Sequence, residues 1–260
     1  MLEAKEAGLI APFEIRAVAF LDVLGFKELI NAAETTANGM AELRSLINEV
    51  DAHVSFDNQG LDKLVPVKVH PDYIFVFDSI IISVPIYHQG YDGLAIVALK
   101  SVQIAQKLLD LGFIVRGGLS VGPVMHEKKN IFGNGYIGAY LAQEKVAKHP
   151  RTIMTDKAKA HFQKAVHLSS PLHQLDLWVK YENELILDTF HPSYLPKERG
   201  TIENSFKHYK KVIYDKLLTL PLGEESRSKW EWMAGFFNSA LKRHQINHVT
   251  GLAFDTLPIP

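Results

Sequence analysis

The sequence contains no cysteine, which excludes disulfide bonds, thiolate nucleophiles and zinc sites built on thiolates. Its net charge is only -1, so it gives no support for general nucleic-acid binding, which usually shows as a basic excess. The 12 histidines are scattered, and no His-x-x-x-His pair lies within a predicted helix. We therefore predict neither a nucleic-acid partner nor a zinc site.

Long hydrophobic runs are also missing. The nearest candidate, residues 73–86, is interrupted by Asp78 and is shorter than the roughly 18 to 20 apolar residues that a membrane helix needs. The first seven residues include acidic side chains and have no apolar core, unlike a signal peptide. With 260 residues, 47% of them hydrophobic, the chain can bury a sizeable core. These features favour a soluble, cytoplasmic protein without a membrane partner.

Three apolar segments each carry one charged residue. Asp22 ends the run from Val18 and is followed by a turn through glycine, Asp78 lies within residues 73–83, and Arg116 lies within residues 113–122. An unpaired carboxylate in an apolar strand costs several kcal/mol or is neutralised. We therefore predict one shared site, with a divalent metal as the partner of the two carboxylates.

Periodicity and turn residues predict the elements around these segments. We expect helices at 26–33, 40–56, 90–111, 136–148 and 157–165. Residues 73–86 should form a hairpin of central strands that turns near Asp78 and Ser79. The other strands are expected at 14–23, 113–121 with a break at Gly117-Gly118, 151–155 and 185–187. A frayed lead-in is expected at 1–12, a linker or weak strand at 61–69, a turn into a short partner strand at 122–126 and a loop at 166–183.

The order of these elements does not alternate as in a doubly wound parallel sheet. It predicts an α+β fold with a ferredoxin-like, split-βαβ core, in which the first strand and the hairpin lie side by side. A Pro- and Gly-rich boundary at 191–200 separates residues 1–190, the expected catalytic domain, from residues 191–260. The second part should be a helical appendage, 201–219 and 224–244, packed on the core or on a second subunit. Trp230 and Trp232 should serve packing there.

The spacing of the charged segments resembles the class III nucleotidyl cyclases, and within them most closely the pyrimidine cyclases of bacterial Pycsar anti-phage systems. The likeness spans roughly residues 14–156, and its first three motifs are fairly specific only when taken together. It is carried by Phe20-Leu-Asp22-Val-Leu-Gly-Phe26, Phe77-Asp-Ser-Ile80, Arg116-Gly-Gly-Leu-Ser-Val-Gly122, Ala139-Tyr140 and Pro150-Arg-Thr-Ile153.

The resemblance implies a fold, a cofactor and roles. Two Mg²⁺ or Mn²⁺ ions would be held by Asp22, Asp78 and the backbone of Val23, and cyclisation would release pyrophosphate. Subunits of this family form head-to-tail dimers with sites at the interface, so a homodimer is implied. Further residues are expected to contact substrate: Gly25, Phe26 and Lys27 the triphosphate, Arg116 phosphate or base, and Tyr73 and Ser79 the nucleotide near the base.

One departure from the family concerns turnover. Active members carry an Asn and an Arg at positions that align here with Ile137 and Leu141, and Gln143 stands near the place of a frequent acidic residue. Loss of a transition-state cation can cost a factor of about 10³ or more. Either another cation, such as Arg116, Lys145 or Arg151, takes over, or the partner subunit supplies a group, or the protein is a weakened relative.

Plainer interpretations stay open for the individual residues. Asp22 could cap the following helix, and Asp78 could be a turn residue. Arg116 could be a structural ion-pair partner of either. Tyr73 could belong to the core, and Lys27 to a solvated helix face.

The sequence thus predicts a metal-dependent cyclase that makes cUMP or cCMP as a defence signal for a downstream cyclic-nucleotide-binding effector. The alternative is an inactive nucleotide-binding regulatory protein on the same fold. A diguanylate cyclase relative would share the core, but the sequence has no Gly-Gly-Asp/Glu-Glu-Phe hairpin. No serine has a His and Asp context that suggests a hydrolase.

Overall fold

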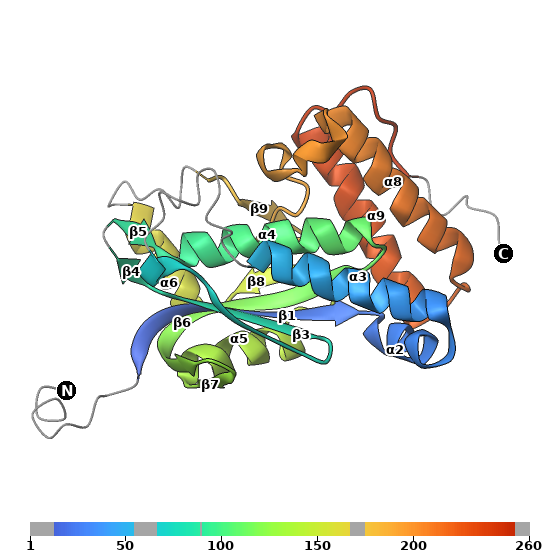
Figure 1. The fold of residues 1–260 in the computed structure, drawn as a ribbon. Helices are drawn as coiled ribbons and strands as arrows, with labels where there is room; N and C mark the ends of the chain where they lie inside the picture. The colour runs from blue at the N-terminus through green and yellow to red at the C-terminus, as the bar shows by residue number, and fades with distance from the viewer. Residues whose placement is uncertain (1–12, 55–66, 89, 167–174, 253–260) are drawn as a thin grey trace, which may run out of the picture.

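A mixed sheet of eight strands forms the centre of the protein, and helices cover both of its faces (Figure 1). The structure is a computed structural model that describes residues 13–54, 67–88, 90–166 and 175–252. It confirms the predicted α+β class. The strands of this sheet are β1 (Glu14–Leu24), β2 (Asp72–Val76), β3 (Ser79–Pro85), β6 (Ile114–Glu127), β7 (Asn130–Phe132), β8 (Thr152–Met154), β9 (Trp178–Tyr181) and β10 (Glu184–Leu187).

The strand order is β2-β3-β1-β6-β8-β10-β9, and β7 pairs with β6. Strand β1 is antiparallel to both β3 and β6, so the hairpin and β6 flank the strand that carries Asp22. Strand β8 is parallel to β6 and antiparallel to β10. The first strand and the hairpin therefore lie side by side, as predicted.

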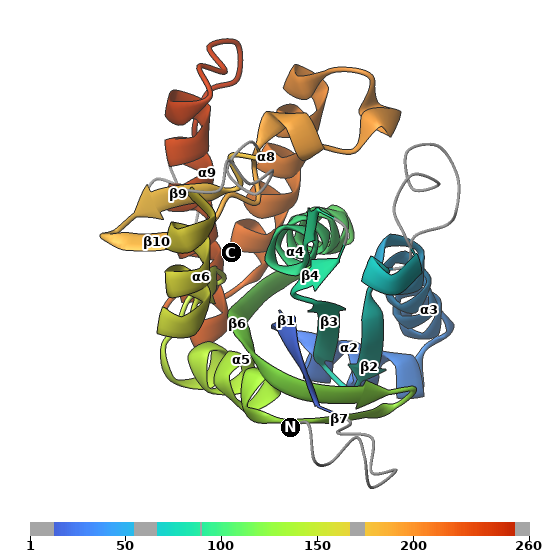
Figure 2. The ribbon, with the colours of Figure 1, turned by 90° about the vertical axis from the view of Figure 1, so that its left-hand side faces the viewer.

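Two hydrophobic layers enclose the sheet. On one face, β1 residues such as Ala19 and Leu21 are fully buried against α2 (Phe26–Thr35), α3 (Ala37–Val54) and α4 (Gly93–Asp110). On the other face, Val18 and Phe20 pack against Ala139 of α5 (Asn134–Lys145). Helix α6 (Asp156–Val166) contributes Ala158 and Ala165 to the first layer. Figure 2 shows α5 and the α3–α4 pair on opposite sides of the sheet.

The C-terminal helices share a second core with the end of the sheet. Helices α8 (Ile202–Thr219) and α9 (Glu225–Arg243) bury Phe206, Phe237 and their neighbours against Ile114 of β6 and Ile186 of β10. Trp230 and Trp232 are buried, which confirms their predicted packing role. The appendage therefore packs on the core of its own chain, and none of the helices in the described residues is both long and apolar enough to cross a membrane.

Several boundaries differ from the prediction for one physical reason: long-range pairing overrides local turn signals. Strand β6 runs unbroken through Gly117-Gly118 and through the expected turn at 122–126, because β1 pairs with it as far as Val124. Strand β2 is an edge strand and not a central one, since β3 separates it from β1.

The loop expected at 166–183 contains strand β9, which turns into β10 through Glu182 and Asn183. Both turn residues have positive φ, 48° and 66°, and Glu is an unusual residue for that conformation, so the turn gave only a weak sequence signal.

The remaining helices and short elements deviate little. A two-residue strand pair, β4 (Tyr87–His88) and β5 (Tyr91–Asp92), precedes α4, so that this helix starts later than expected, where the Asp92 carboxylate caps it. Residues 67–69 of the expected linker or weak strand form a 3-10 helix. The lead-in at 1–12, most of the 61–69 segment and residues 167–174 of the expected loop lie outside the described residues.

Candidate functional site

Asp22 and Arg116 meet at the end of β1. They are direct partners in the β1–β6 register, and the Arg116 Nε donates a hydrogen bond to Asp22 Oδ2 at 2.5 Å. The Asp22 side chain is 11% exposed and the Arg116 side chain 28%. The antiparallel pairing of two strands that are far apart in sequence therefore brings together two of the three predicted charged residues.

Asp78 approaches from the other neighbour of β1. It lies in the two-residue turn between β2 and β3, and its carbonyl accepts a hydrogen bond from the Val23 amide at 2.8 Å. Ser79 pairs with Asp22 in the β1–β3 register, and its hydroxyl donates to Asp78 Oδ1 at 3.0 Å. The hairpin turn is thus fixed to the end of β1 by its backbone.

The surroundings of Asp22 disfavour the ionised form of its carboxyl group. Burial raises its pKa above the ordinary value, Arg116 lowers it through the hydrogen bond and the charge, and the nearby Asp78 raises it again; the net direction is upward. A raised pKa means that the ionised carboxylate is disfavoured in the folded chain. Such perturbed acids concentrate at functional sites, although structural ion-pair networks also produce them.

Gln143 also contacts Asp22, and this contact was not predicted from the sequence. It is buried on α5, and its Nε2 donates to Asp22 Oδ2 at 3.1 Å. Helix α5 reaches the strand because Gly118 has no side chain: a Cβ there would lie 2.2 Å from the Ala139 carbonyl oxygen. The glycine pair after Arg116 was the available signal for this close approach.

The hairpin turn carries a second missed feature. Phe77 is 63% exposed and has φ 55°, a left-handed conformation that an aromatic residue rarely adopts. Its ring contacts Phe26 at a centroid distance of 5.4 Å. Strain of this kind concentrates at functional sites.

The turn after β1 has the geometry of an anion-binding segment. Gly25 has φ 88° and stands at the N-cap of α2, where a glycine offers no side chain to the first-turn amides of that helix. Phe26 is buried in the core, and Lys27 is exposed on the helix. Gly25 and Phe26 thus offer backbone amides close to the Asp22 cluster.

Tyr73 is not brought to the cluster. It packs with Phe75 on the α2–α4 face of the sheet, and its hydroxyl donates to Asp51 of α3 at 2.9 Å. Asp22 faces α5 on the opposite side. Tyr73 therefore lies across the sheet from the Asp22 cluster, near which it was expected to contact the nucleotide base.

The donor set fits a hard divalent cation in part. No described residue donates a hydrogen bond to Asp22 Oδ1, and Asp78 is close enough to repel the Asp22 charge. Within the described residues no group of three or more His, Cys, Asp or Glu side chains gathers as a metal site. Mg²⁺ and Mn²⁺ accept one or two carboxylates when substrate phosphates, backbone oxygens and water complete the coordination.

The positions that aligned with the family's Asn and Arg lie on the exposed side of α5. Ile137 is 48% and Leu141 36% exposed, and neither contacts the Asp22 cluster of its own chain through a polar group. Lys145 is exposed at the end of the same helix.

Comparison with known proteins adds no relative. No protein-family model matches the chain, and no curated protein matches it.

Proposed function

We propose that the protein is a metal-dependent nucleotidyl cyclase that converts a nucleoside triphosphate to its 3′,5′-cyclic nucleotide and pyrophosphate. The observation that carries this proposal is the convergence of Asp22, Asp78 and Arg116 at the ends of three neighbouring strands. The strand order β2-β3-β1-β6 is that of a ferredoxin-like core and supports the class III cyclase likeness.

The proposed chemistry assigns each residue a task. Asp22 and Asp78 hold the divalent cations, together with a backbone oxygen of Val23. When bound, these cations would lower the pKa of the ribose 3′-hydroxyl and neutralise charge on the attacked phosphate and the leaving pyrophosphate. The amides at Gly25 and Phe26 bind phosphate oxygens, and Ser79 holds the Asp78 carboxylate in place. Lys27 adds a charge near the same turn.

Arg116 has two tasks in this proposal. Its guanidinium partly offsets the charge of Asp22 through their ion pair, and it would move to a phosphate oxygen when substrate and cations are bound. Gln143 keeps its amide on Asp22 Oδ2 and fixes the carboxylate rotamer. Asp22 would therefore bind metal only when the cations replace the positive charge of Arg116.

A homodimer would complete the site. Large apolar side chains are exposed on β7, along α5 and at the residue that follows α5; we take them as one interaction patch, because exposed apolar patches are typical of interaction surfaces. A two-fold partner docked there would bring the same face of its own α5 to the Asp22 cluster. The patch consists of Phe132, Ile137, Tyr140, Leu141 and Val146.

The base is proposed as uracil or cytosine, on the likeness to the pyrimidine cyclases, and the product as a second messenger in antiviral defence. A matched experiment tests the activity: each of ATP, GTP, CTP and UTP is incubated with the protein and Mn²⁺, and the products are separated by liquid chromatography. Asp22→Asn and Asp78→Asn should each abolish the cyclic product, whereas Asp156→Asn, an exposed acid on α6, should not.

A second function is favoured by one observation. Ile137 and Leu141 are apolar on the face where the family carries polar transition-state groups. A catalytically inactive, nucleotide-binding regulatory protein would bind nucleoside triphosphates in calorimetry without turnover. Cyclic product that disappears in Asp22→Asn would eliminate this alternative.

A further inference from the structure

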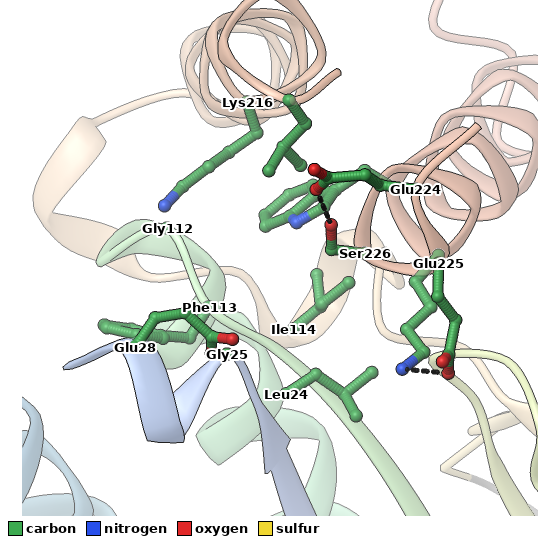
Figure 3. A pocket seen from close by; sticks show the side chains of 13 residues that line it. Leu24, Gly25, Glu28, Gly112, Phe113, Ile114, Lys216, Glu224, Glu225 and Ser226 are labelled. Carbon is green, nitrogen blue, oxygen red and sulfur yellow. Dashed lines mark hydrogen bonds and ion pairs between the residues drawn. The ribbon is translucent and has the colours of Figure 1, made fainter. Parts of the chain in front are cut away.

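A cavity of about 560 Å³ lies where the C-terminal helices meet the sheet, beside the Gly25 turn (Figure 3). This volume is within the range of pockets that bind small molecules. It is formed by the end of β1, the start of α2, the start of β6 and the facing ends of α8 and α9. The appendage therefore creates a compartment that the core alone would not have.

The inner surface of the cavity is apolar and aromatic. Leu24, Ile114 and the rings of Phe113 and Trp230 line it, and all of them belong to the buried or half-buried core. A planar apolar group can pack against such rings and gain from the removal of water. This lining selects for a ligand with a hydrophobic, preferably aromatic, body.

Lys216 brings a positive charge into these surroundings. Its Nζ lies 5.8 Å from the centre of the Phe113 ring and 5.9 Å from that of Trp230. Burial lowers its pKa below the ordinary value. No carboxylate among the described residues forms an ion pair with it, whereas Lys229, the other lysine of the cavity, pairs with Glu225 at 2.8 Å. Lys216 is thus the lysine of the cavity that is available to an incoming anion.

Acidic side chains at the opening of the cavity limit the negative charge that a bound anion can carry. Three acidic side chains, Glu28, Glu224 and Glu225, line the opening and are exposed. Figure 3 shows Glu224 and Glu225 at the start of α9, across the cavity from Gly25 and Glu28. Like charges disfavour a polyanion, so a triphosphate is a poor occupant, while a single negative group can reach Lys216 between them.

We propose that this cavity is a binding site for a small organic monoanion with an aromatic body, whose carboxylate or sulfonate contacts Lys216 and whose ring packs against Trp230 and Phe113. The cavity adjoins the proposed phosphate-binding turn through Gly25, which lines it, but the inference rests on Lys216 and the aromatic rings and is independent of the proposed cyclase activity.

The test uses the full chain and 8-anilinonaphthalene-1-sulfonate, an aromatic monoanion, as the probe. Its fluorescence is titrated together with tryptophan quenching, because Trp230 lines the cavity. We expect saturable binding of one probe per chain. Lys216→Met, which keeps the aliphatic stem, should weaken it by about tenfold or more, because one charge-assisted contact is lost.

Two further variants keep the result interpretable. Lys211→Met removes an exposed lysine of the same helix and should leave the affinity for the probe within about twofold, because Lys211 is not among the residues that line the cavity. Leu220→Trp, which fills the cavity from α8, should also abolish binding even if Lys216→Met folds poorly. Equal affinity in the wild type, Lys216→Met and Leu220→Trp would overturn the proposal, as would binding without saturation.

Two further measurements distinguish this cavity from the proposed nucleotide site. Asp22→Asn should bind the probe as the wild type does, and UTP with Mn²⁺ should not displace it competitively. Competitive displacement would show that the cavity belongs to the nucleotide site and would overturn the proposal. Loss of cyclase activity in any assay leaves the probe titration unaffected, so the two hypotheses fail separately.

Discussion

Asp22 and Arg116 face each other across the β1–β6 register and share a hydrogen bond of 2.5 Å, yet the pKa of Asp22 remains above its ordinary value. Burial and the neighbouring Asp78 charge outweigh the single guanidinium. The pair is therefore under-neutralised, and a further cation is the natural way to satisfy it.

The first prediction concerns stability at this pair. A carboxyl whose folded-state pKa is raised stabilises the fold at acid pH, and this contribution is lost as the pH rises through that pKa. At neutral pH, Asp22→Asn should thus leave the melting temperature unchanged or raise it by up to about 3 °C, while it removes activity. Differential scanning calorimetry measures this, and a fall of several degrees would show that Asp22 is a structural acid.

A buried acid that directly follows β10 and contacts the appendage provides the matched contrast. Asp188 accepts hydrogen bonds from Arg243 at 2.8 Å and from His244 at 2.7 Å. Burial alone would raise its pKa, but these two partners lower it overall. Its stabilising contribution is therefore fully present at neutral pH and is lost as the pH falls through the lowered pKa.

Asp188→Asn should accordingly lower the free energy of unfolding by about 2 kcal/mol, or roughly 6 °C in melting temperature, because the Arg243 guanidinium loses its buried anion and His244 loses its carboxylate partner. Thermal unfolding at pH 7 measures the change. If Asp188→Asn and Asp22→Asn shift the melting temperature equally, the distinction between a structural and a functional carboxylate is wrong.

Metal binding should follow the ionisation of Asp22. The pKa of Asp22 is raised. As the pH is lowered, the affinity for Mn²⁺ should therefore begin to fall at a higher pH than it would at a site with an ordinary aspartate. Arg116→Gln removes a group that lowers this pKa, so the midpoint should move to still higher pH. Calorimetric titration of Mn²⁺ between pH 5 and 8 tests this, and an unchanged midpoint in Arg116→Gln would contradict it.

The approach of α5 to the sheet predicts a contrast between two glycines. A Cβ at Gly118 would meet the Ala139 oxygen at 2.2 Å and the Gln143 nitrogen at 2.9 Å, so Gly118→Ala should displace α5 and cost about 2 kcal/mol or more. A Cβ at Gly25 meets no atom within 4 Å, and only its φ of 88° opposes substitution, at about 1 kcal/mol. Urea denaturation of both variants should rank them in this order; the reverse order would show that the helix yields without cost.

The exposed patch on α5 predicts an oligomer. Leu141→Glu should convert a dimer to a monomer in sedimentation velocity and lower activity, because a charge replaces an apolar contact. Ile202→Glu, at an exposed apolar residue of α8, serves as the control and should leave both unchanged. A wild-type protein that is monomeric and active would refute the shared site.

Much of this arrangement could be predicted from local pattern. The apolar runs around Asp22 and Asp78 predicted the buried strands β1 and β3, although β2 is a partly exposed edge strand, and the element order predicted that the hairpin lies beside β1. The contacts that depend on pairing over long sequence distances could not be predicted. Gln143 reaches Asp22 over a separation of 121 residues, and Tyr73 faces away because the side chains of β2 alternate.

The C-terminal cavity shows the same limit. Trp230 was expected to pack, and it does, but nothing in the sequence of α8 indicates that Lys216 stands beside Phe113 and Trp230 without a carboxylate partner among the described residues. Lys216, Phe113 and Trp230 come together only because α8, α9 and β6 pack against one another in the folded chain.

The most direct measurement is product analysis after incubation of the purified wild type and of Asp22→Asn with each of the four nucleoside triphosphates and Mn²⁺. The account predicts a cyclic nucleotide and pyrophosphate in equal amounts from the wild type, preferentially from UTP or CTP, and none from Asp22→Asn. No cyclic product from any triphosphate, or the same product from both proteins, would contradict it.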